Sequence, residues 1–303
     1  MTFNSESQIT SDALAVISDV FHIKPESIAD IQVLKKGMTN RSFLFSVGDD
    51  RYIIRIPGEG TERLINRAHE ADVFHAIDGY GLCDNPIYLN PNNGYKITRY
   101  LEGVRTCDAG NERDLAKCME MLRRFHGLKL SVGHTFDIFE QIEFYESLWG
   151  GLASLHDDYD ETKANALSLK TFIDSLDKDF CLTHIDAVPD NFLFHQTAQG
   201  EALQLTDWEY SGMQDPHVDV AMFCIYSLYD KPQVDKLIDI YFEDNCDRVT
   251  RTKIYAYIAI CGLLWSNWCE FKARLGVEFG AYSQRQYQFA KDYYSYTMKE
   301  IMN

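Results

Sequence analysis

Two short stretches dominate the interpretation of this chain: HIDAVPDN at residues 184–191 and TDWEY at residues 206–210. Apolar runs flank both, so Asp186 and Asn191 are expected in a loop between two strands, and Asp207 at the end of the next strand. Phosphoryl transfer from a nucleotide needs a carboxylate that takes the acceptor's proton, and oxygen ligands for Mg²⁺. Asp186 fits the first role, and Asn191 and Asp207 fit the second. A polar turn would explain each residue singly, but not the whole arrangement.

The composition narrows the classes of partner. The 303 residues include 46 acidic and 29 basic side chains, a formal net charge of −17. Nucleic acid and anionic membranes are bound through clustered Lys and Arg, so neither partner is expected. The charge is also uneven, because residues 1–100 carry 10 basic and 13 acidic side chains, whereas residues 101–303 carry 19 and 33. The second part of the chain therefore suits a cationic ligand better than the first.

The cysteines and apolar runs indicate a cytoplasmic protein. The eight cysteines form no CxxC pair and show no zinc-like spacing. The N-terminal residues lack the basic and apolar regions of a signal peptide. The longest apolar run, residues 254–265, spans 12 residues, well short of the roughly 20 that a membrane span requires. We expect reduced thiols, no membrane partner and a cytoplasmic location.

The patterning changes near residue 100, and this change predicts an α+β fold of two lobes. Short β-like runs come first, interrupted by one helical segment from Thr61 to about Asp78, with Thr61 as its N-cap. The strands are expected at residues 31–34, 42–47, 52–56 and 95–100. The later helices are expected at residues 111–128, 137–154, 161–176, 219–228, 232–245, 251–275 and 283–301, with a small β insertion at residues 180–183, 192–195 and 203–206. Residues 1–100 should form a nucleotide-binding lobe with a small antiparallel sheet and one helix. Residues 104–303 should form a mainly helical catalytic and acceptor-binding lobe, after a hinge at about residues 98–103.

Residues 184–191 and 207–210 together resemble the catalytic and metal-binding motifs of the choline/ethanolamine kinases. This family belongs to the aminoglycoside-phosphotransferase superfamily, which has a protein-kinase-like fold. The resemblance runs from about Val33 to Tyr294 and is greatest to bacterial choline kinases that prepare phosphocholine for cell-surface decoration. It implies a bilobal kinase-like fold, ATP as co-substrate, Mg²⁺ as cofactor, Asp186 as the catalytic base and Asn191 and Asp207 as metal ligands.

The resemblance also implies a nucleotide site in the first lobe. The stretch KKGMTNRSF at residues 35–43 lies where a phosphate-covering loop is expected, although an ordinary hairpin turn would have the same spacing. Arg55 is a cation within an apolar strand, which must pair or face a cleft. The family tends to use such an arginine to hold the α- and β-phosphates, with Glu70 as its ion-pair partner here, although Glu70 could equally be a solvated surface residue. The expected nucleotide-binding residues are Gly37, Thr39, Asn40, Ser42, Arg55, Glu70, Thr98 and Tyr100.

The expected acceptor substrate is inferred from aromatic residues. Trp265 and Trp268 are spaced i, i+3 on one face of a predicted helix. A quaternary ammonium has no N–H to donate, so aromatic faces bind it. Such pairs more often pack in a core, but the family uses Trp-x-x-Trp in this position for choline. The expected choline-binding residues are Trp208, Glu209, Tyr210, Tyr226, Trp265, Trp268 and Tyr282. Eukaryotic members have an acidic residue where this chain has Tyr226, which leaves the choice between choline and ethanolamine open.

We therefore expect an ATP- and Mg²⁺-dependent phosphotransferase that acts on the hydroxyl of choline and gives phosphocholine. Ethanolamine and aminoglycosides are alternative acceptors, because kinases for them share Asp186, Asn191 and Asp207. A catalytically silent binding protein for a cationic small molecule is the alternative of another class. Such a protein would be marked by loss of the base or of a metal ligand, and this chain has all three residues. The sequence gives no indication of the oligomeric state.

Overall fold

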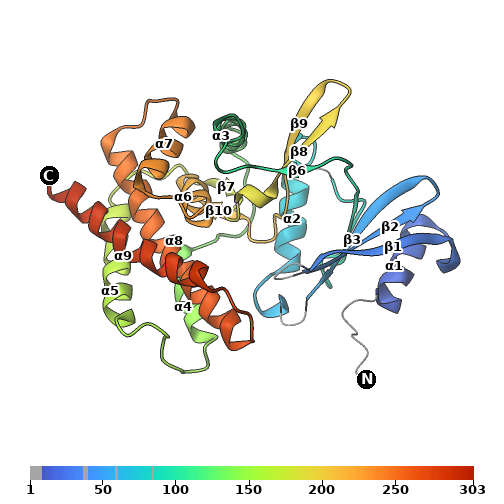
Figure 1. Cartoon of the computed structure of the whole chain (residues 1–303), viewed down its shortest axis with the longest axis horizontal. Coiled ribbons are helices and arrows are strands. Elements are labelled where there is room, and N and C mark those ends of the chain that lie inside the picture. Colours follow the sequence, from blue (N-terminus) through green and yellow to red (C-terminus); the bar gives the residue numbers. More distant parts are fainter. Residues whose placement is uncertain (1–8, 37–39, 59–60, 84) are drawn as a thin grey trace. The chain divides into compact units, whose positions relative to one another are not determined.

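The computed structural model describes residues 9–36, 40–58, 61–83 and 85–303, without the side chains of residues 35 and 36. The chain divides into two compact units (Figure 1). Unit 1 comprises residues 1–105 and 194–210, and unit 2 comprises residues 106–193 and 211–303. From the sequence we placed residues 194–210 in the second lobe. In the structure they pack with unit 1, where the Leu205 N–H donates to the Leu82 carbonyl at 2.8 Å.

Unit 1 is built on an antiparallel sheet of five strands in the order β1-β2-β3-β5-β4, all formed by described residues. The strands are β1 (Ile28–Lys36), β2 (Asn40–Val47), β3 (Asp50–Pro57), β4 (Tyr88–Leu89) and β5 (Lys96–Arg99). A tight turn joins β2 to β3, with Gly48 at φ 61°, a left-handed conformation that glycine adopts without steric cost. The sheet contains every strand expected from residues 31–100, each at or near its expected position.

Helix α1 (Ser11–Phe21) covers this sheet and was not expected from the sequence. The Thr10 hydroxyl accepts the Ala13 N–H at its start, as an N-cap residue does. Ala13 and Ile17 are buried in the same core as Phe45, and Phe21 packs on the Tyr52 ring with centroids 4.6 Å apart. In Figure 1, α1 lies beside β1. Its apolar face seals a sheet face that would otherwise be exposed.

Helix α2 (Arg67–Ile77) begins later than expected. Its N-cap is Asn66, whose side-chain oxygen accepts the Ala68 and His69 N–H groups. Thr61 instead begins a short 3-10 turn, Thr61–Arg63, and its hydroxyl donates to the Gly58 carbonyl. The expected N-cap at Thr61 is therefore wrong, because a stronger capping residue follows it.

The central β insertion forms two further sheets. Strands β6 (Arg105–Thr106), β8 (Phe192–Thr197) and β9 (Gly200–Leu205) make one, in the order β6-β8-β9. In unit 2, β7 (Cys181–Thr183) pairs antiparallel with β10 (Gly212–Gln214). The Thr183 hydroxyl also donates to the Gly212 carbonyl at 2.8 Å. This pairing fixes the start of the loop at residues 184–191.

The helices of unit 2 pack around α8, which is buried along most of its length. They are α3 (Glu112–Gly127), α4 (Ile138–Ser147), α5 (Tyr159–Asp174), α6 (His217–Tyr226), α7 (Lys231–Phe242), α8 (Arg248–Arg274) and α9 (Ala281–Met302). Figure 1 shows α9 (red) crossing α8 (orange). Their backbones approach closely at Gly262, where an added Cβ would lie 2.8 Å from the Gln286 carbonyl oxygen. A larger residue at position 262 would force these helices apart.

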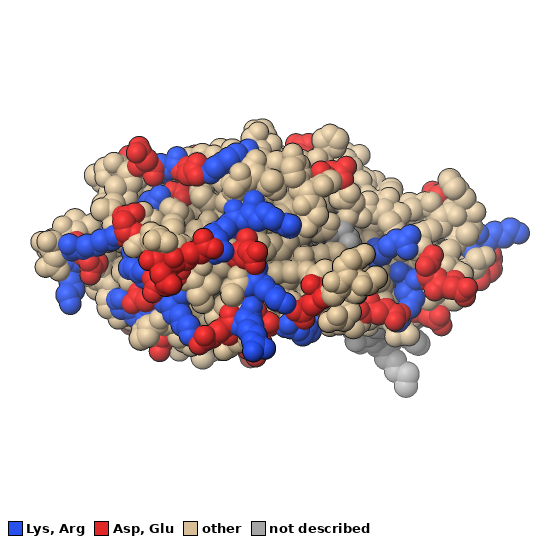
Figure 2. Space-filling view, turned by 90° about the horizontal axis from the view of Figure 1, so that it is seen from above, with Lys and Arg blue, Asp and Glu red and all other residues tan. Residues whose placement is uncertain are grey.

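The surface and the core show three further features. On the face seen in Figure 2, Lys and Arg side chains lie among Asp and Glu. Among the described residues, no helix has both the length and the apolar character needed to cross a membrane. All eight cysteines lie in the described part of the chain, where none forms a disulfide bond, and six of the eight thiols are buried. Burial raises the pKa of the Cys181 thiol to about 12, which keeps it protonated and unreactive.

Candidate active site

In unit 2, the loop at residues 184–191 brings Asp186 and Asn191 together. The Asn191 side-chain NH₂ donates to the Asp186 backbone carbonyl at 2.9 Å and to its carboxylate Oδ2 at 3.0 Å. The backbone N–H groups of Val188 and Asn191 close two further turns, onto the carbonyls of Asp186 and Val188. With its nitrogen directed at Asp186, Asn191 keeps its side-chain oxygen as an acceptor for a ligand.

A backbone strain lies directly beside Asp186. Ile185 has φ 70°, which is unusual for a β-branched residue and unfavourable by roughly 1–3 kcal/mol. The buried carboxylate of Asp219, at the start of α6, holds this conformation. It accepts the Ile185 N–H at 2.7 Å and the His184 N–H at 2.9 Å. Asp219 therefore fixes the direction in which the Asp186 side chain leaves the loop.

A second layer of hydrogen bonds supports Asp219. His126 Nε2 lies 2.9 Å from Asp219 Oδ2, and His126 Nδ1 lies 2.8 Å from the Tyr241 hydroxyl. All three side chains are buried. Neither His126 nor Asp219 was among the candidate residues. An ionisable group within an apolar helix, such as Asp219 in DVAMFCIY, needs a buried partner, and this signal in the sequence points to it.

In unit 1, Arg55 and Glu70 form a buried bidentate ion pair. Arg55 Nη1 and Nη2 lie 2.5 and 2.7 Å from the two Glu70 oxygens, and Nη2 also donates to the Gly94 carbonyl at 2.9 Å. Burial alone would raise the pKa of Glu70, but the charges of Lys96 and Arg55 lower it to about 2. The strand cation and the helix carboxylate are thus locked in one geometry.

Arg67 extends this pair into a network that the sequence did not reveal. Its Nη1 lies 2.9 Å from Glu70 Oε2 and 2.8 Å from Glu209 Oε2, and its Nη2 donates to Asn40 Oδ1 at 3.1 Å. Asn40 in turn donates its side-chain N–H to Glu209 Oε2 at 2.9 Å. Glu209, expected among the choline-binding residues, therefore lies with the candidate nucleotide-binding residues Arg55 and Asn40 within unit 1.

Asp207 is held close to the same charges. It has φ 66° and follows β9. Burial, with a contribution from the Glu209 carboxylate, raises the pKa of Asp207 to about 6, and the positive charges of Lys96 and Arg55 oppose this rise. Lys96 Nζ lies 3.5 Å from Glu70 Oε1, and burial lowers its own pKa. Asp207 is half-buried, and a carboxylate with a raised pKa gains from a bound cation.

In unit 2, aromatic rings make a continuous series of contacts, here called the aromatic cluster. The centroid distances are 6.4 Å for Tyr145–Trp265, 5.7 Å for Trp265–Trp268, 5.4 Å for Trp268–Phe279, 6.3 Å for Phe279–Tyr282 and 6.0 Å for Tyr282–Tyr226. Trp265 and Trp268 keep 7% and 6% of their surface exposed. Phe279 and Tyr145 were not among the candidate residues, since one lies outside the predicted helices and the other resembles any core tyrosine.

The aromatic cluster reaches the loop of Asp186 through Tyr226. The Tyr226 hydroxyl donates to Asp190 Oδ2 at 3.4 Å, and Asp190 stands directly before Asn191. Burial raises the pKa of both Tyr226 and Tyr282, and the charge of Asp186 adds to the rise in each. The predicted aromatic residues Tyr226, Trp265, Trp268 and Tyr282 are thus brought together beside the loop of the predicted base.

The remaining candidate residues that the structure describes are not among the members of the ion-pair network or the aromatic cluster described above. Trp208 has 0% of its surface exposed, and its indole N–H donates to the Leu205 carbonyl at 2.8 Å, so it packs inside unit 1 with the buried Tyr210 nearby in sequence. Gly37 and Thr39 lie outside the described residues. Ser42 on β2 pairs with Arg55 on β3. Thr98 on β5 pairs with Ile53, and Tyr100 lies under the Arg51 guanidinium, 4.4 Å from its ring centroid.

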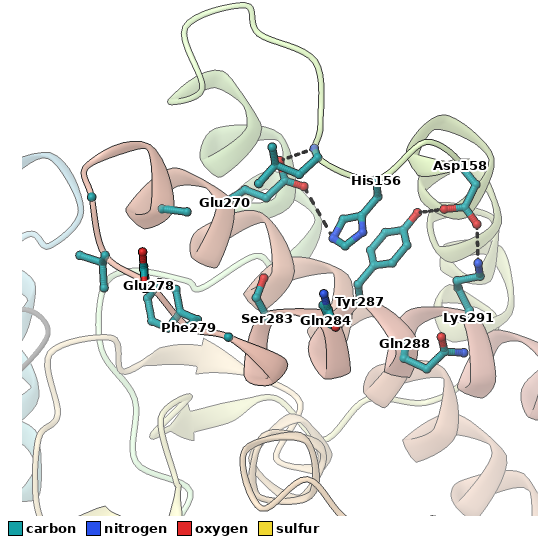
Figure 3. Close-up of a pocket in the computed structure, with 15 residues that line it drawn as sticks. His156, Asp158, Glu270, Glu278, Phe279, Ser283, Gln284, Tyr287, Gln288 and Lys291 are labelled. Carbon is teal, nitrogen blue, oxygen red and sulfur yellow. Dashed lines mark hydrogen bonds and ion pairs between the residues drawn. The ribbon is translucent and has the colours of Figure 1, made fainter.

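A pocket of about 730 Å³ lies between the end of α8, the start of α9 and residues 155–158 (Figure 3). The His156 and Tyr287 rings stack with centroids 3.6 Å apart, and the Tyr287 hydroxyl donates to Asp158 at 2.8 Å. The buried Glu270 accepts the Ser154 hydroxyl at 2.5 Å and the Leu155 N–H at 3.0 Å. Both carboxylates are thus occupied by partners within unit 2. Phe279 lines this pocket and also belongs to the aromatic cluster.

The fold and the sequence define a kinase-type phosphotransferase. The family model described as choline/ethanolamine kinase matches residues 31–243, and the chain belongs to this family. Protein LicA of Haemophilus influenzae is 28% identical over 264 residues, which cover 82% of this chain and 76% of that protein.

Solved structures of choline kinases are also similar to this chain. The crystal structure of choline kinase LicA from Streptococcus pneumoniae is 28% identical, with a TM-score of 0.79, and the match covers 94% of this chain and 100% of that chain. A structure of LicA in complex with AMP is 27% identical, with a TM-score of 0.78, covering 95% and 100%. The expected α+β, kinase-like fold and the expected family are confirmed.

Proposed function

We propose that this chain transfers the terminal phosphoryl group of ATP to the hydroxyl of choline and releases phosphocholine and ADP. The aromatic cluster carries the proposal. Its rings lead from Trp265 to Tyr226, and the Tyr226 hydroxyl bonds to Asp190 in the loop that holds Asp186. Aromatic faces suit a trimethylammonium group, which offers no N–H for a hydrogen bond. The likeness to the Streptococcus pneumoniae choline kinase LicA supports the same acceptor.

In the proposed mechanism, Asp186 orients the choline hydroxyl and takes its proton as the oxygen bonds to the terminal phosphorus. The bond from that phosphorus to the bridging oxygen breaks, and ADP leaves. Asn191 and Asp219 fix Asp186 for this role through the contacts described above. Arg55, held by Glu70, binds the phosphates of ATP, and the likeness to LicA in complex with AMP supports an adenine nucleotide.

Asn191 and Asp207 are the proposed ligands of Mg²⁺. Both offer oxygen donors, which Mg²⁺ prefers. The Asn191 nitrogen is occupied by Asp186, so its oxygen is the atom left to bind a metal. The raised pKa of Asp207 also fits a carboxylate that accepts a cation on loading. When bound, Mg²⁺ would neutralise charge on the transferred phosphate. We place this ATP-dependent reaction in the cytoplasm, in keeping with thiols that form no disulfide among the described residues.

Ethanolamine is the second candidate acceptor. A primary ammonium carries three N–H groups and needs acceptors for them, whereas the aromatic cluster offers mainly ring faces. An aminoglycoside would need several carboxylates directed at its ammonium groups. Near the cluster, Glu270 is already bonded to Ser154 and Leu155. Choline is therefore favoured over both ethanolamine and aminoglycosides.

The test is a coupled ADP-release assay with ATP and Mg²⁺ across choline, ethanolamine and an aminoglycoside panel. We expect choline to give the highest kcat/KM. Higher kcat/KM for an aminoglycoside would contradict the proposed acceptor. Silence across the panel, with a protein that binds choline in calorimetry, would instead support the catalytically silent binding protein.

A further inference from the structure

The aromatic cluster is contacted by two side chains of opposite charge. At one end, Lys272 Nζ lies 5.6 Å from the Trp268 ring centroid. At the other end, Asp190 accepts the Tyr226 hydroxyl at 3.4 Å. A cation that approaches the cluster is therefore repelled near Trp268 and attracted near Tyr226. The rings themselves carry no net charge, so these two side chains make the two ends of the cluster electrostatically different.

We propose that Asp190 is a specificity-determining residue, whose carboxylate holds the onium group of the acceptor at the Tyr226–Tyr282 end of the aromatic cluster. The inference rests on the proposed function and adds a charged residue to the proposed choline site. In choline, two carbons separate the hydroxyl oxygen from the nitrogen. Asp186 is needed at the hydroxyl, and Asp190 lies four residues later in the same loop. Together the two carboxylates address both ends of one small molecule.

The surroundings of Asp190 fit this role. Its side chain is exposed, whereas the neighbouring Pro189 is buried, so the short 3-10 turn Pro189–Asn191 turns the carboxylate outward while anchoring its backbone. Tyr226 holds the carboxylate from one side and packs edge-on against Tyr282 with centroids 6.0 Å apart. An exposed carboxylate next to ring faces acts on a cation through both charge and polarisable surface.

The expected effect is moderate, because solvent and salt screen an exposed charge. Asp190→Asn should raise the choline KM about fivefold, with kcat and the ATP KM unchanged. The effect should shrink as ionic strength rises from low to high. Tyr226→Phe keeps the ring but removes the hydroxyl that holds Asp190, and should raise the choline KM about threefold.

The decisive comparison uses 3,3-dimethylbutan-1-ol, the neutral carbon isostere of choline, as alternative acceptor or competitive inhibitor. Asp190→Asn should leave the binding constant of this alcohol unchanged while weakening choline. Glu243→Gln is the charge-matched control, because it removes an exposed carboxylate that pairs with Arg123 and not with the aromatic cluster. It should change neither the choline KM nor the binding constant of the neutral alcohol.

Equal loss for choline and for the neutral alcohol, or a fall in kcat in place of a rise in KM, would overturn the inference and assign Asp190 to positioning of the loop. An unchanged choline KM would overturn it as well. A wild-type protein that phosphorylates no choline would overturn the proposed function first, and the inference with it, so the two failures are distinguishable.

Discussion

In unit 1, the candidate nucleotide-binding residues are held by ion pairs, whereas in unit 2 the candidate acceptor residues are held by ring contacts. Arg55, Glu70, Arg67 and Glu209 bond to one another at 2.5–3.5 Å, and every partner is buried. The members of the aromatic cluster instead contact one another through their rings, with centroids 5.4–6.4 Å apart. Phosphate groups need fixed point charges, and an onium group needs a surface of the right shape.

This difference predicts that substitutions in the two regions will have different effects. Removal of one member from a buried charge network leaves its partners unpaired, which reduces stability as well as function. Removal of one ring from the aromatic cluster takes away a contact surface and leaves a cavity, but it leaves no charge unpaired. Variants of the charge network should therefore make the free energy of unfolding depend differently on pH, whereas variants of the aromatic cluster should raise one KM and lower stability without changing its pH dependence.

The largest effect is expected at Asp186, which belongs to neither type of site. Asp186→Asn removes the proton acceptor but keeps the size of the side chain. We expect kcat to fall by about 10²–10⁴-fold, with the midpoint of thermal unfolding and ATP binding unchanged. Steady-state kinetics and calorimetric ATP titration measure both. Asp179→Asn, which removes an exposed carboxylate paired with Lys129, is the control. Near-normal turnover by Asp186→Asn would refute its role as base.

The charge network gives a pH-dependent stability. The pKa of Glu70 is lowered from 4.5 to about 2 in the folded protein. A lowered pKa contributes stability that is fully present above the unfolded value and is lost as the pH falls from about 4.5 towards 2. The shift corresponds to about 3 kcal/mol. Urea unfolding from pH 6 to pH 3 should show part of this loss in the wild type.

Glu70→Gln is the matching variant. It should be less stable than the wild type at pH 6 by about 3–5 kcal/mol, because Arg55 and Arg67 are left without their shared carboxylate. Its stability should depend less on pH over the same range. An unfolding free energy with the same pH slope in both proteins would show that Glu70 does not carry this dependence.

Asp219 tests whether strain in the loop matters for catalysis. Asp219→Asn weakens the bonds that hold Ile185 at φ 70°, and we expect kcat to fall by tens-fold with a smaller change in either KM. Asp215→Asn is a suitable control, since Asp215 is equally buried but bonds to Lys253 and Tyr257. It should lower stability and leave kcat near that of the wild type. Equal kcat losses in the two variants would remove the special role of Asp219.

The smallest effect is expected in the aromatic cluster. Trp265→Ala should raise the choline KM by about threefold to thirtyfold, in line with the loss of one cation–π contact. The ATP KM should not change. Trp208→Phe is the contrasting variant, because Trp208 has no exposed surface and bonds within unit 1. It should change stability but neither KM. A similar rise of both KM values in Trp265→Ala would assign Trp265 to packing alone.

Much of the fold was predictable, because strands and helices follow local patterning. The expected strands and most expected helices lie at or near their expected positions, as for the helix expected at residues 111–128 and found as α3. The helix expected at residues 137–154 ends early, at Ser147. Helix α1 was missed although Thr10 supplied an N-cap and Ala13 and Ile17 a helical spacing. The start of α2 was misplaced because Thr61 and Asn66 can both cap a helix, and the stronger capping residue, Asn66, is the one that does so.

Contacts within the candidate site were predictable where a motif is contiguous. Asp186 and Asn191 were identified within one eight-residue stretch, and they bond to each other. The bond between Arg67 and Glu209 joins residues 142 positions apart, and no local pattern indicates such a pairing. Trp208 was expected to bind choline because it stands in a family motif, but a motif does not indicate whether a ring is exposed. The Trp208 ring is fully buried.

The acceptor is the central claim, and one competition experiment tests it most directly. Equal concentrations of choline and ethanolamine are incubated with the full chain, limiting ATP and Mg²⁺, and the two phosphorylated products are separated by ³¹P NMR. The account predicts that phosphocholine exceeds phosphoethanolamine by at least about tenfold, and that Trp265→Ala reduces this ratio. Phosphoethanolamine in equal or greater amount from the wild type would contradict it.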